Sequence, residues 1–85
     1  LAKCFVTNEE LTVGNMEVHH VVPKSQGGDD NYSNLIYITK DVHKLIHATQ
    51  LETINKYLKL ISISETIIQD INWCRKLVDN FEICL

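Results

Sequence analysis

The feature that most limits how this chain can fold is the placement of its histidines. All four of them lie between positions 19 and 47, as the adjacent residues His19 and His20 and as the pair His43 and His47. Histidine is the commonest protein ligand for transition metals and a general base near neutral pH. A fold that brings the two pairs together can supply both functions, so this segment predicts a metal site with a base beside it.

The second pair is predicted to lie on a helix. Thr39 is a typical N-cap residue, and Asp41 places an acidic group in the first turn. Residues four apart lie one above the other on a helix, so the imidazoles of His43 and His47 can face one ion. The same His-x-x-x-His spacing occurs in other helical metal sites.

The first pair is predicted to lie on a strand. Residues 16–22 are rich in β-branched side chains, and Pro23 ends the segment. Adjacent residues of a strand face opposite sides, so only one of His19 and His20 can join the helical pair directly. This asymmetry suits one metal ligand and one base.

A loop and a second strand are predicted between the first strand and the helix. Residues 24–34 contain Gly27 and Gly28, several turn formers and no aliphatic side chain. Residues 35–38, Leu-Ile-Tyr-Ile, form the second strand. If the strands pair and the helix packs across them, residues 16–49 form a ββα hairpin-plus-helix unit of an α+β fold.

Two additional helices are predicted over about residues 51–80, as part of a single domain that covers residues 1–85. Their apolar positions are Ile54, Tyr57, Leu58 and Ile61, then Ile67, Ile68, Ile71, Cys74, Leu77 and Val78. We interpret these stripes as core faces rather than as a docking surface, because a small domain needs them to cover the hairpin. Ser64 is placed to cap the second helix, and residues 81–85 are predicted to form a short terminal strand.

The pattern of the central segment resembles that of a known family. From Glu17 the chain reads Glu-Val-His-His-x-x-Pro-x-x-x-Gly-Gly-x-Asp, followed by Asn-Leu and by His-x-x-x-His. This pattern resembles the HNH endonucleases, also called the ββα-metal nucleases. Residues 4–11, residues 41–49 and the late pair Asn72 and Arg75 look most like the HNH domain at the C-terminus of group II intron reverse transcriptases.

The resemblance implies a role for each residue of the motif. His19 matches the first metal ligand, and His43 and His47 match the other two. His20 matches the general base that activates water, and Asn34 matches the asparagine that holds the loop and orients the base. The implied cofactor is one divalent ion, Mg²⁺ or Mn²⁺ for activity, with Zn²⁺ or Ni²⁺ able to occupy the site.

The cysteines depart from part of the family. Many HNH domains carry two Cys-x-x-Cys pairs that bind a structural zinc, whereas here Cys4 begins Cys-Phe-Val-Thr, and Cys74 and Cys84 lie far along the chain. We therefore expect no structural zinc and interpret each cysteine as a small buried apolar side chain. An odd number of cysteines and the lack of a signal peptide favour an intracellular setting, in the cytoplasm, nucleoid or organelle matrix.

The net charge of −3 is unusual for a protein that binds nucleic acid. Lys24 and Lys44 are the lysines placed near the predicted site. We expect DNA as the substrate, with most of the affinity supplied by other partners. In a group II intron protein these would be the rest of the reverse transcriptase and the intron RNA. No apolar run approaches the roughly eighteen residues that span a membrane, so no membrane partner is expected.

The leading hypothesis is an endonuclease domain that hydrolyses a phosphodiester with histidine-activated water and nicks one strand of the target DNA for intron mobility. One alternative is a free-standing HNH nuclease of the phage or restriction type, which a basic surface or a dimer interface would favour. Another is a non-catalytic metal-binding module, which would have a closed coordination shell with His20 as the fourth ligand.

Overall fold

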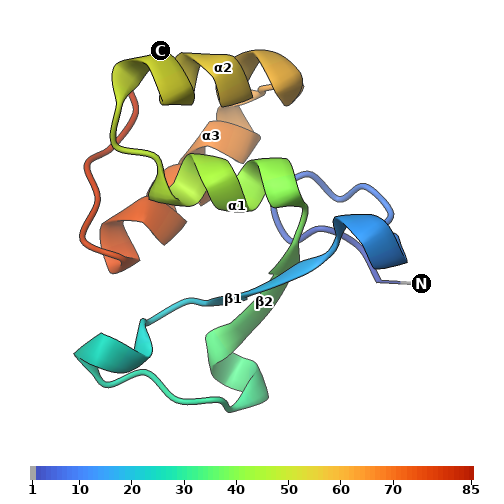
Figure 1. The fold of residues 1–85 in the computed structure, drawn as a ribbon, viewed down its shortest axis with the longest axis vertical. Coiled ribbons are helices and arrows are strands. Elements are labelled where there is room, and N and C mark those ends of the chain that lie inside the picture. The colour runs from blue at the N-terminus through green and yellow to red at the C-terminus, as the bar shows by residue number, and fades with distance from the viewer. Residues whose placement is uncertain (1) are drawn as a thin grey trace.

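The structure is a computed structural model that describes residues 2–85. Two strands precede three α-helices along the chain (Figure 1). The elements are η1 (Val13–Asn15), β1 (Glu17–His20), η2 (Lys24–Gln26), η3 (Tyr32–Asn34), β2 (Leu35–Ile38), α1 (Lys40–His47), α2 (Leu51–Leu60) and α3 (Glu65–Leu77). The predicted α+β class, with a ββα unit followed by helices, is confirmed.

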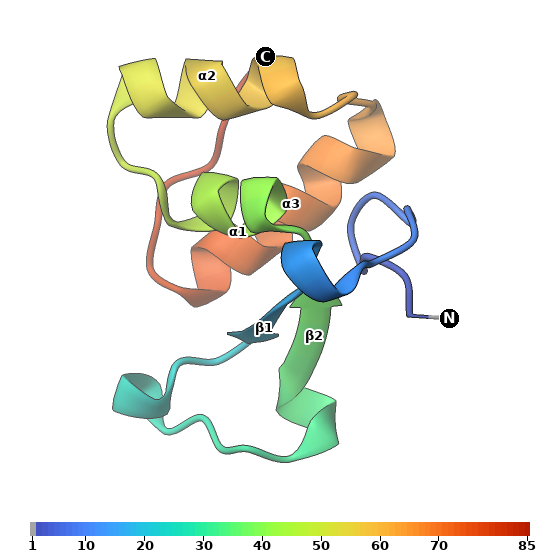
Figure 2. The ribbon, with the colours of Figure 1, turned by 45° about the vertical axis from the view of Figure 1, so that its right-hand side comes forward.

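The two strands form an antiparallel hairpin. Its register places Glu17 opposite Ile38 and His19 opposite Ile36. Because side chains alternate along a strand, Glu17 and His19 share one face, and Val18 lies on the other face, where it is exposed. In Figures 1 and 2 the loop of the hairpin lies at the end of the molecule opposite α2, and α1 lies between α2 and the hairpin.

Helix α1 begins as the sequence predicts. The Oγ1 atom of Thr39 accepts a hydrogen bond from the backbone N–H of Val42 at 3.2 Å, and Asp41 lies in the first turn. The side chains of Val42, Leu45 and Ile46 are buried in the core with the other helices. His43 and His47 lie on the face of α1 that is directed toward the hairpin. The amphipathic pattern of α1 therefore fixes which of its faces can form a site.

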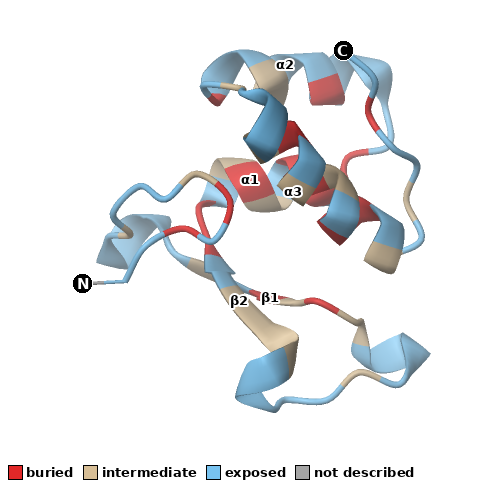
Figure 3. Cartoon of the chain, turned by 180° about the vertical axis from the view of Figure 1, so that it is seen from behind, coloured by how far each residue is buried: buried red, intermediate tan, exposed pale blue. Residues whose placement is uncertain are grey.

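Helices α2 and α3 both contribute buried residues to the core. Ser64 caps α3 as predicted, because its Oγ accepts a hydrogen bond from the N–H of Ile67 at 3.2 Å. The buried positions of the two helices are Ile54, Ile68, Ile71, Cys74 and Arg75. Figure 3 shows buried residues on all three helices, and every position of the two apolar stripes except Leu77 belongs to the core or packs against it. The interpretation of the stripes as core faces is therefore confirmed for all positions but Leu77. None of the helices in residues 2–85 has both the length and the apolar character needed to cross a bilayer.

Residues 81–85 form no strand, so that prediction is wrong. The side chain of Asn72 instead donates to the carbonyl of Ile83 at 2.9 Å and accepts from its N–H at 2.8 Å. The Nε of Arg75 donates to the carbonyl of Phe81 at 2.7 Å. Side chains of α3 therefore form hydrogen bonds with backbone N–H and C=O groups of this segment, which in a sheet would pair with a neighbouring strand.

The buried guanidinium of Arg75 also holds the C-terminal end of α1. Its Nη1 donates to the carbonyls of Leu45 at 2.6 Å and Ala48 at 2.9 Å, where a helix leaves its carbonyls without partners. Asn72 and Arg75 therefore have a structural role, and Arg75 fixes the end of the helix that carries two of the histidines.

The interpretation of the cysteines is right for two of the three. Cys4 and Cys74 are buried in the core, whereas Cys84 is exposed. Burial raises the pKa of the Cys74 thiol to about 12, so this thiol is protonated and unreactive near neutral pH. Cys84 lies within the segment that forms no strand, and its side chain is exposed.

Candidate metal centre

Three histidines meet where β1 crosses α1. The ring centroid of His19 lies 5.3 Å from that of His43 and 5.3 Å from that of His47, and the centroids of the two helical rings lie 5.0 Å apart. One nitrogen from each ring lies within 4.8 Å of the others. Zinc–nitrogen bonds of about 2.1 Å allow two nitrogens of one ion to lie up to about 4.2 Å apart, so small ring rotations would let all three bind one ion.

The buried ring of His19 carries a nitrogen without a partner beside the two other histidines of the cluster. His19 is only 3% exposed, and its Nε2 has no hydrogen-bond partner among the described residues. Leaving a buried polar atom unpaired costs about 1–3 kcal/mol, so such atoms are rare unless something else binds them. The all-imidazole donor set fits a divalent transition metal, which would satisfy this nitrogen.

The surroundings keep two of these rings neutral. Burial lowers the pKa of His19 to about 4, with smaller contributions from the charges of His43, His47 and His20. Burial also lowers the pKa of His47, followed by the charges of His43 and Arg75. A metal ion binds the neutral imidazole, so the site favours the form that can act as a ligand near neutral pH.

A carboxylate orients one ring of the cluster. Oε1 of Glu17 lies 2.5 Å from Nδ1 of His43. Metal-binding histidines commonly donate their second N–H to a carboxylate, which fixes the ring and its tautomer. Sequence reasoning assigned no role to Glu17. A signal was present, since Glu17 lies two residues before His19 and therefore on the same face of the strand.

His20 lies apart from this cluster, on the other face of β1. Its Nε2 lies 2.7 Å from Oδ1 of Asp30, and Oδ2 of Asp30 accepts a hydrogen bond from Nζ of Lys24 at 2.8 Å. These bonds, the one from Lys24 first, lower the pKa of Asp30. Sequence reasoning gave no role to Asp30, although it is the last residue of the Gly-Gly-x-Asp pattern.

Asn34 ties together the two ends of the loop. Its Oδ1 accepts from the N–H of Val22 at 2.8 Å, and its Nδ2 donates to the carbonyl of Val22 at 3.0 Å and to that of Asp29 at 2.8 Å. Within the described residues its side chain makes no hydrogen bond to His20. The geometry fits the expected task of holding the loop, and any effect on His20 passes through the loop.

The two loop glycines allow this closure. Gly27 has φ of +93°, a left-handed conformation that glycine adopts readily. A Cβ at Gly28 would lie 1.8 Å from the carbonyl oxygen of Val22 and 2.9 Å from Nδ2 of Asn34. No other residue fits at Gly28 unless the loop moves away from the strand.

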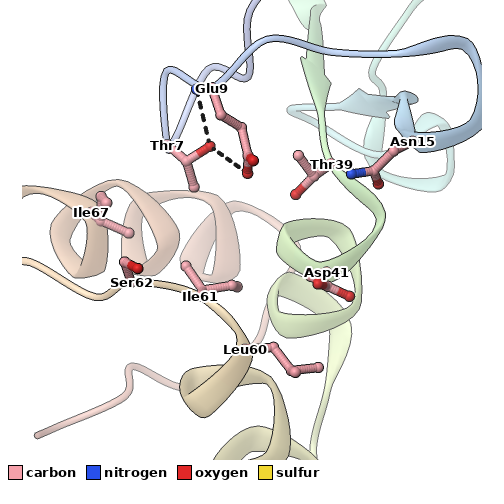
Figure 4. Close-up of a pocket in the computed structure, with 9 residues that line it drawn as sticks. All are labelled: Thr7, Glu9, Asn15, Thr39, Asp41, Leu60, Ile61, Ser62 and Ile67. Carbon is pink, nitrogen blue, oxygen red and sulfur yellow. Dashed lines mark hydrogen bonds between the residues drawn. The ribbon is translucent and has the colours of Figure 1, made fainter.

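A separate cavity of about 320 Å³ lies at the other end of α1 (Figure 4). Thr7 and Glu9 from the N-terminal segment line it together with Asp41, and the hydroxyl of Thr7 donates to Glu9 at 3.1 Å. It contains no histidine. The metal centre instead opens onto two shallower depressions, one lined by Lys44 and the other by Lys24.

Comparison with known proteins agrees with this geometry. The family model described as HNH endonuclease matches residues 6–49, about half of the chain, and includes every residue of the candidate site. The chain belongs to the HNH endonuclease family. Domains of this family bind a divalent metal ion, and membership supports nuclease activity in general.

One relative comes from a virus. Over 36 residues this HNH chain is 39% identical to the probable mobile endonuclease C of Enterobacteria phage T4. That stretch is 42% of this chain and 17% of the phage protein, so the likeness concerns one segment of a much longer protein. No solved structure matches the chain.

Proposed function

We propose that this HNH domain is a metal-dependent DNA endonuclease, with His19, His43 and His47 as metal ligands and His20 as the general base. The observation that supports this most directly is the division of labour between the adjacent histidines. The ring of His19 enters the cluster with an unpaired buried nitrogen, while that of His20 turns away toward Asp30.

Each group has a task in the hydrolysis of a phosphodiester. A divalent ion, when bound, stabilises negative charge on the phosphate and on the leaving 3′-oxygen. His20 takes a proton from the attacking water, a task for which a neutral imidazole is suited. Asn34 keeps the loop closed, and Glu17 keeps the ring of His43 facing the cluster.

Two lysines support DNA as the substrate. Lys24 lines one depression beside His20, and Lys44 lines the other beside His43 and His47. Each is placed to contact a phosphate of a strand that lies across the cluster, and such contacts position nucleic acid without reading its sequence. The substrate class we propose is duplex DNA, bound through its backbone.

The arrangement disfavours a closed structural metal site. That alternative requires His20 as the fourth ligand, but the ring of His20 is bonded to Asp30, and the candidate metal group contains the other three histidines alone among the described residues. Three protein ligands leave positions open for substrate, which is typical of catalytic sites.

We further propose that the cut is a nick in one strand that serves the mobility of a DNA element. The flanking residues, including Asn72 and Arg75, resemble group II intron proteins, in which the new 3′ end primes reverse transcription. The phage relative is named a probable mobile endonuclease, which favours the alternative of a phage-type nuclease. The coding sequence upstream distinguishes the two settings, because a Tyr-x-Asp-Asp motif there belongs to a reverse transcriptase.

A plasmid assay tests the proposed activity. Supercoiled DNA should become nicked circles when micromolar domain is mixed with Mg²⁺ or Mn²⁺, and chelator should stop the reaction. His20→Ala purified in the same way controls for contaminating nucleases. Intact plasmid in the presence of metal-loaded, folded wild-type domain would contradict the proposal, and linear product without nicked intermediates would contradict single-strand nicking.

A further inference from the structure

Asp30 uses its two carboxylate oxygens for two different partners. Oδ1 pairs with Nε2 of His20 at 2.7 Å, and Oδ2 accepts from Lys24 at 2.8 Å. The lowered pKa of Asp30 means that the carboxylate is ionised near neutral pH and can only accept hydrogen bonds. The proton in the first contact therefore belongs to Nε2 of His20.

This contact determines which ring nitrogen is free. A neutral imidazole carries one proton, so a proton on Nε2 leaves Nδ1 as the acceptor. No group of the described residues donates a hydrogen bond to Nδ1 of His20, and the side chain is 32% exposed, which gives water access to it. His20 is thus held with one nitrogen occupied and the other available.

We propose that Asp30 is a positioning residue that holds His20 as the Nε2–H tautomer, so that Nδ1 takes the proton of the attacking water. The inference rests on the proposed function and adds to it the atom that acts as base. The O–H bond of water breaks toward Nδ1, the oxygen bonds to phosphorus, and the bond from phosphorus to the 3′-oxygen breaks. The 3′-oxygen leaves with the electron pair of that bond and takes a proton from solvent water to become a hydroxyl. The ring becomes an imidazolium whose Nε2–H remains on Asp30, and it later releases the Nδ1 proton to solvent.

The loop holds Asp30 in place from both sides. The backbone carbonyl of the preceding residue, Asp29, accepts a hydrogen bond from Asn34 at 2.8 Å. The side-chain carboxylate of Asp29 accepts a hydrogen bond from the N–H of Asn31 at 3.1 Å. Lys24 fixes the second oxygen of Asp30. The expected influence of Asn34 on the base therefore acts through the backbone on which Asp30 lies.

Nitrogen-15 NMR of the histidine side chains tests the tautomer without any reaction. In the metal-free wild-type domain, long-range proton–nitrogen spectra should place the His20 proton on Nε2. Asp30→Ala should shift the Nε2 resonance and raise the Nδ1–H share, whereas Glu65→Gln, which removes an exposed charge at the start of α3, should leave both unchanged. A wild-type proton on Nδ1, or an Asp30→Ala spectrum identical to wild type, would overturn the inference.

Cleavage kinetics test the consequence. Asp30→Ala should lower kcat roughly 10- to 100-fold, the usual cost of a misoriented group, with unchanged metal affinity and unchanged or lower KM for DNA. Asp30→Asn, which keeps an acceptor oxygen, should recover part of the rate. In a His20→Ala background, Asp30→Ala should cause no further loss.

The outcomes separate the inference from the proposed function. If His20→Ala cleaves as fast as wild type, the proposed base is wrong. If His20→Ala is slow but Asp30→Ala keeps the wild-type kcat, the base stands and the role of Asp30 is overturned. If Asp30→Ala lowers kcat by the same factor in the wild-type and His20→Ala backgrounds, the role of Asp30 is also overturned, because Asp30 would then act independently of His20.

Discussion

Glu17 on β1 and His43 on α1 are joined through Oε1 and Nδ1, which lie 2.5 Å apart. The contact links the strand to the helix at the one place where both contribute a histidine to the cluster. It also holds the ring of His43 at a fixed angle, so the geometry of the metal centre depends on a residue that binds no metal.

Glu17→Gln should therefore weaken metal binding without unfolding the domain. Partners of metal-binding histidines typically contribute roughly 10- to 100-fold to affinity, because they fix the ring and raise its basicity. Calorimetric titration of the chelator-treated variant with Zn²⁺ measures the loss. Glu65→Gln, at the exposed start of α3, is the matched control. Equal affinity in wild type and Glu17→Gln would mean that the contact has no role in metal binding.

Substitutions of the histidines should separate ligands from base. His20→Ala should keep metal affinity within a few-fold and slow cleavage by roughly two to four orders of magnitude, the usual contribution of a general base. His19→Ala should lose metal and activity together, and His43→Ala/His47→Ala should abolish stoichiometric binding. Calorimetric titration with metal and a cleavage assay on each variant test both expectations. Loss of metal binding in His20→Ala would mean that the roles assigned to His19 and His20 are reversed.

The ββα unit was predictable because its signals are local. Thr39 caps α1 through its own side chain, and β1 lies within the β-branched run before Pro23, although it ends at His20 rather than at Val22. Strand alternation also showed that His19 and His20 must separate. Which of the two faces α1 depends on the pairing of β1 with β2, so only the resemblance indicated His19.

The parts that sequence reasoning missed depend on contacts between distant residues. The backbone of residues 81–85 forms hydrogen bonds with the side chains of Asn72 and Arg75. No sequence pattern within residues 81–85 predicts these contacts. Asp30 meets His20 only because Gly28 and Asn34 close the loop. Alternation along β1 could have found Glu17, but no local rule finds Asp30.

The close approach at Gly28 predicts a specific loss of stability. Gly28→Ala should destabilise the domain by about 1–3 kcal/mol, the range of overpacking substitutions, because its Cβ meets the carbonyl of Val22. Gly14→Ala is the control, since no atom lies within 4 Å of its added Cβ, and a change of about 0.5 kcal/mol or less is expected. Urea unfolding followed by circular dichroism measures both, and equal midpoints would contradict the close approach.

Acid should destabilise the metal-free domain through His19. Its pKa is about 4 in the folded state against an ordinary value of 6.5, so the unfolded chain binds the proton first as pH falls. The stabilisation is complete above about pH 6.5 and is lost toward pH 4, by about 3 kcal/mol at most. Urea unfolding at each half-unit of pH measures this slope. His19→Gln should flatten it, and a wild-type stability that is constant from pH 7 to 4 would contradict the neutral, buried ring.

The sparse positive charge predicts weak binding to DNA by the domain alone. With a net charge of −3 and two lysines beside the cluster, we expect about two to four phosphate contacts and an affinity between sub-millimolar and tens of micromolar. Fluorescence anisotropy of a random duplex across a salt series, with His20→Ala to prevent cleavage, measures the affinity and the slope. Lys44→Gln should reduce the slope by about one, whereas Lys59→Gln on α2 should not. Nanomolar binding with a steep slope would contradict this expectation and would favour a nuclease that finds its DNA unaided.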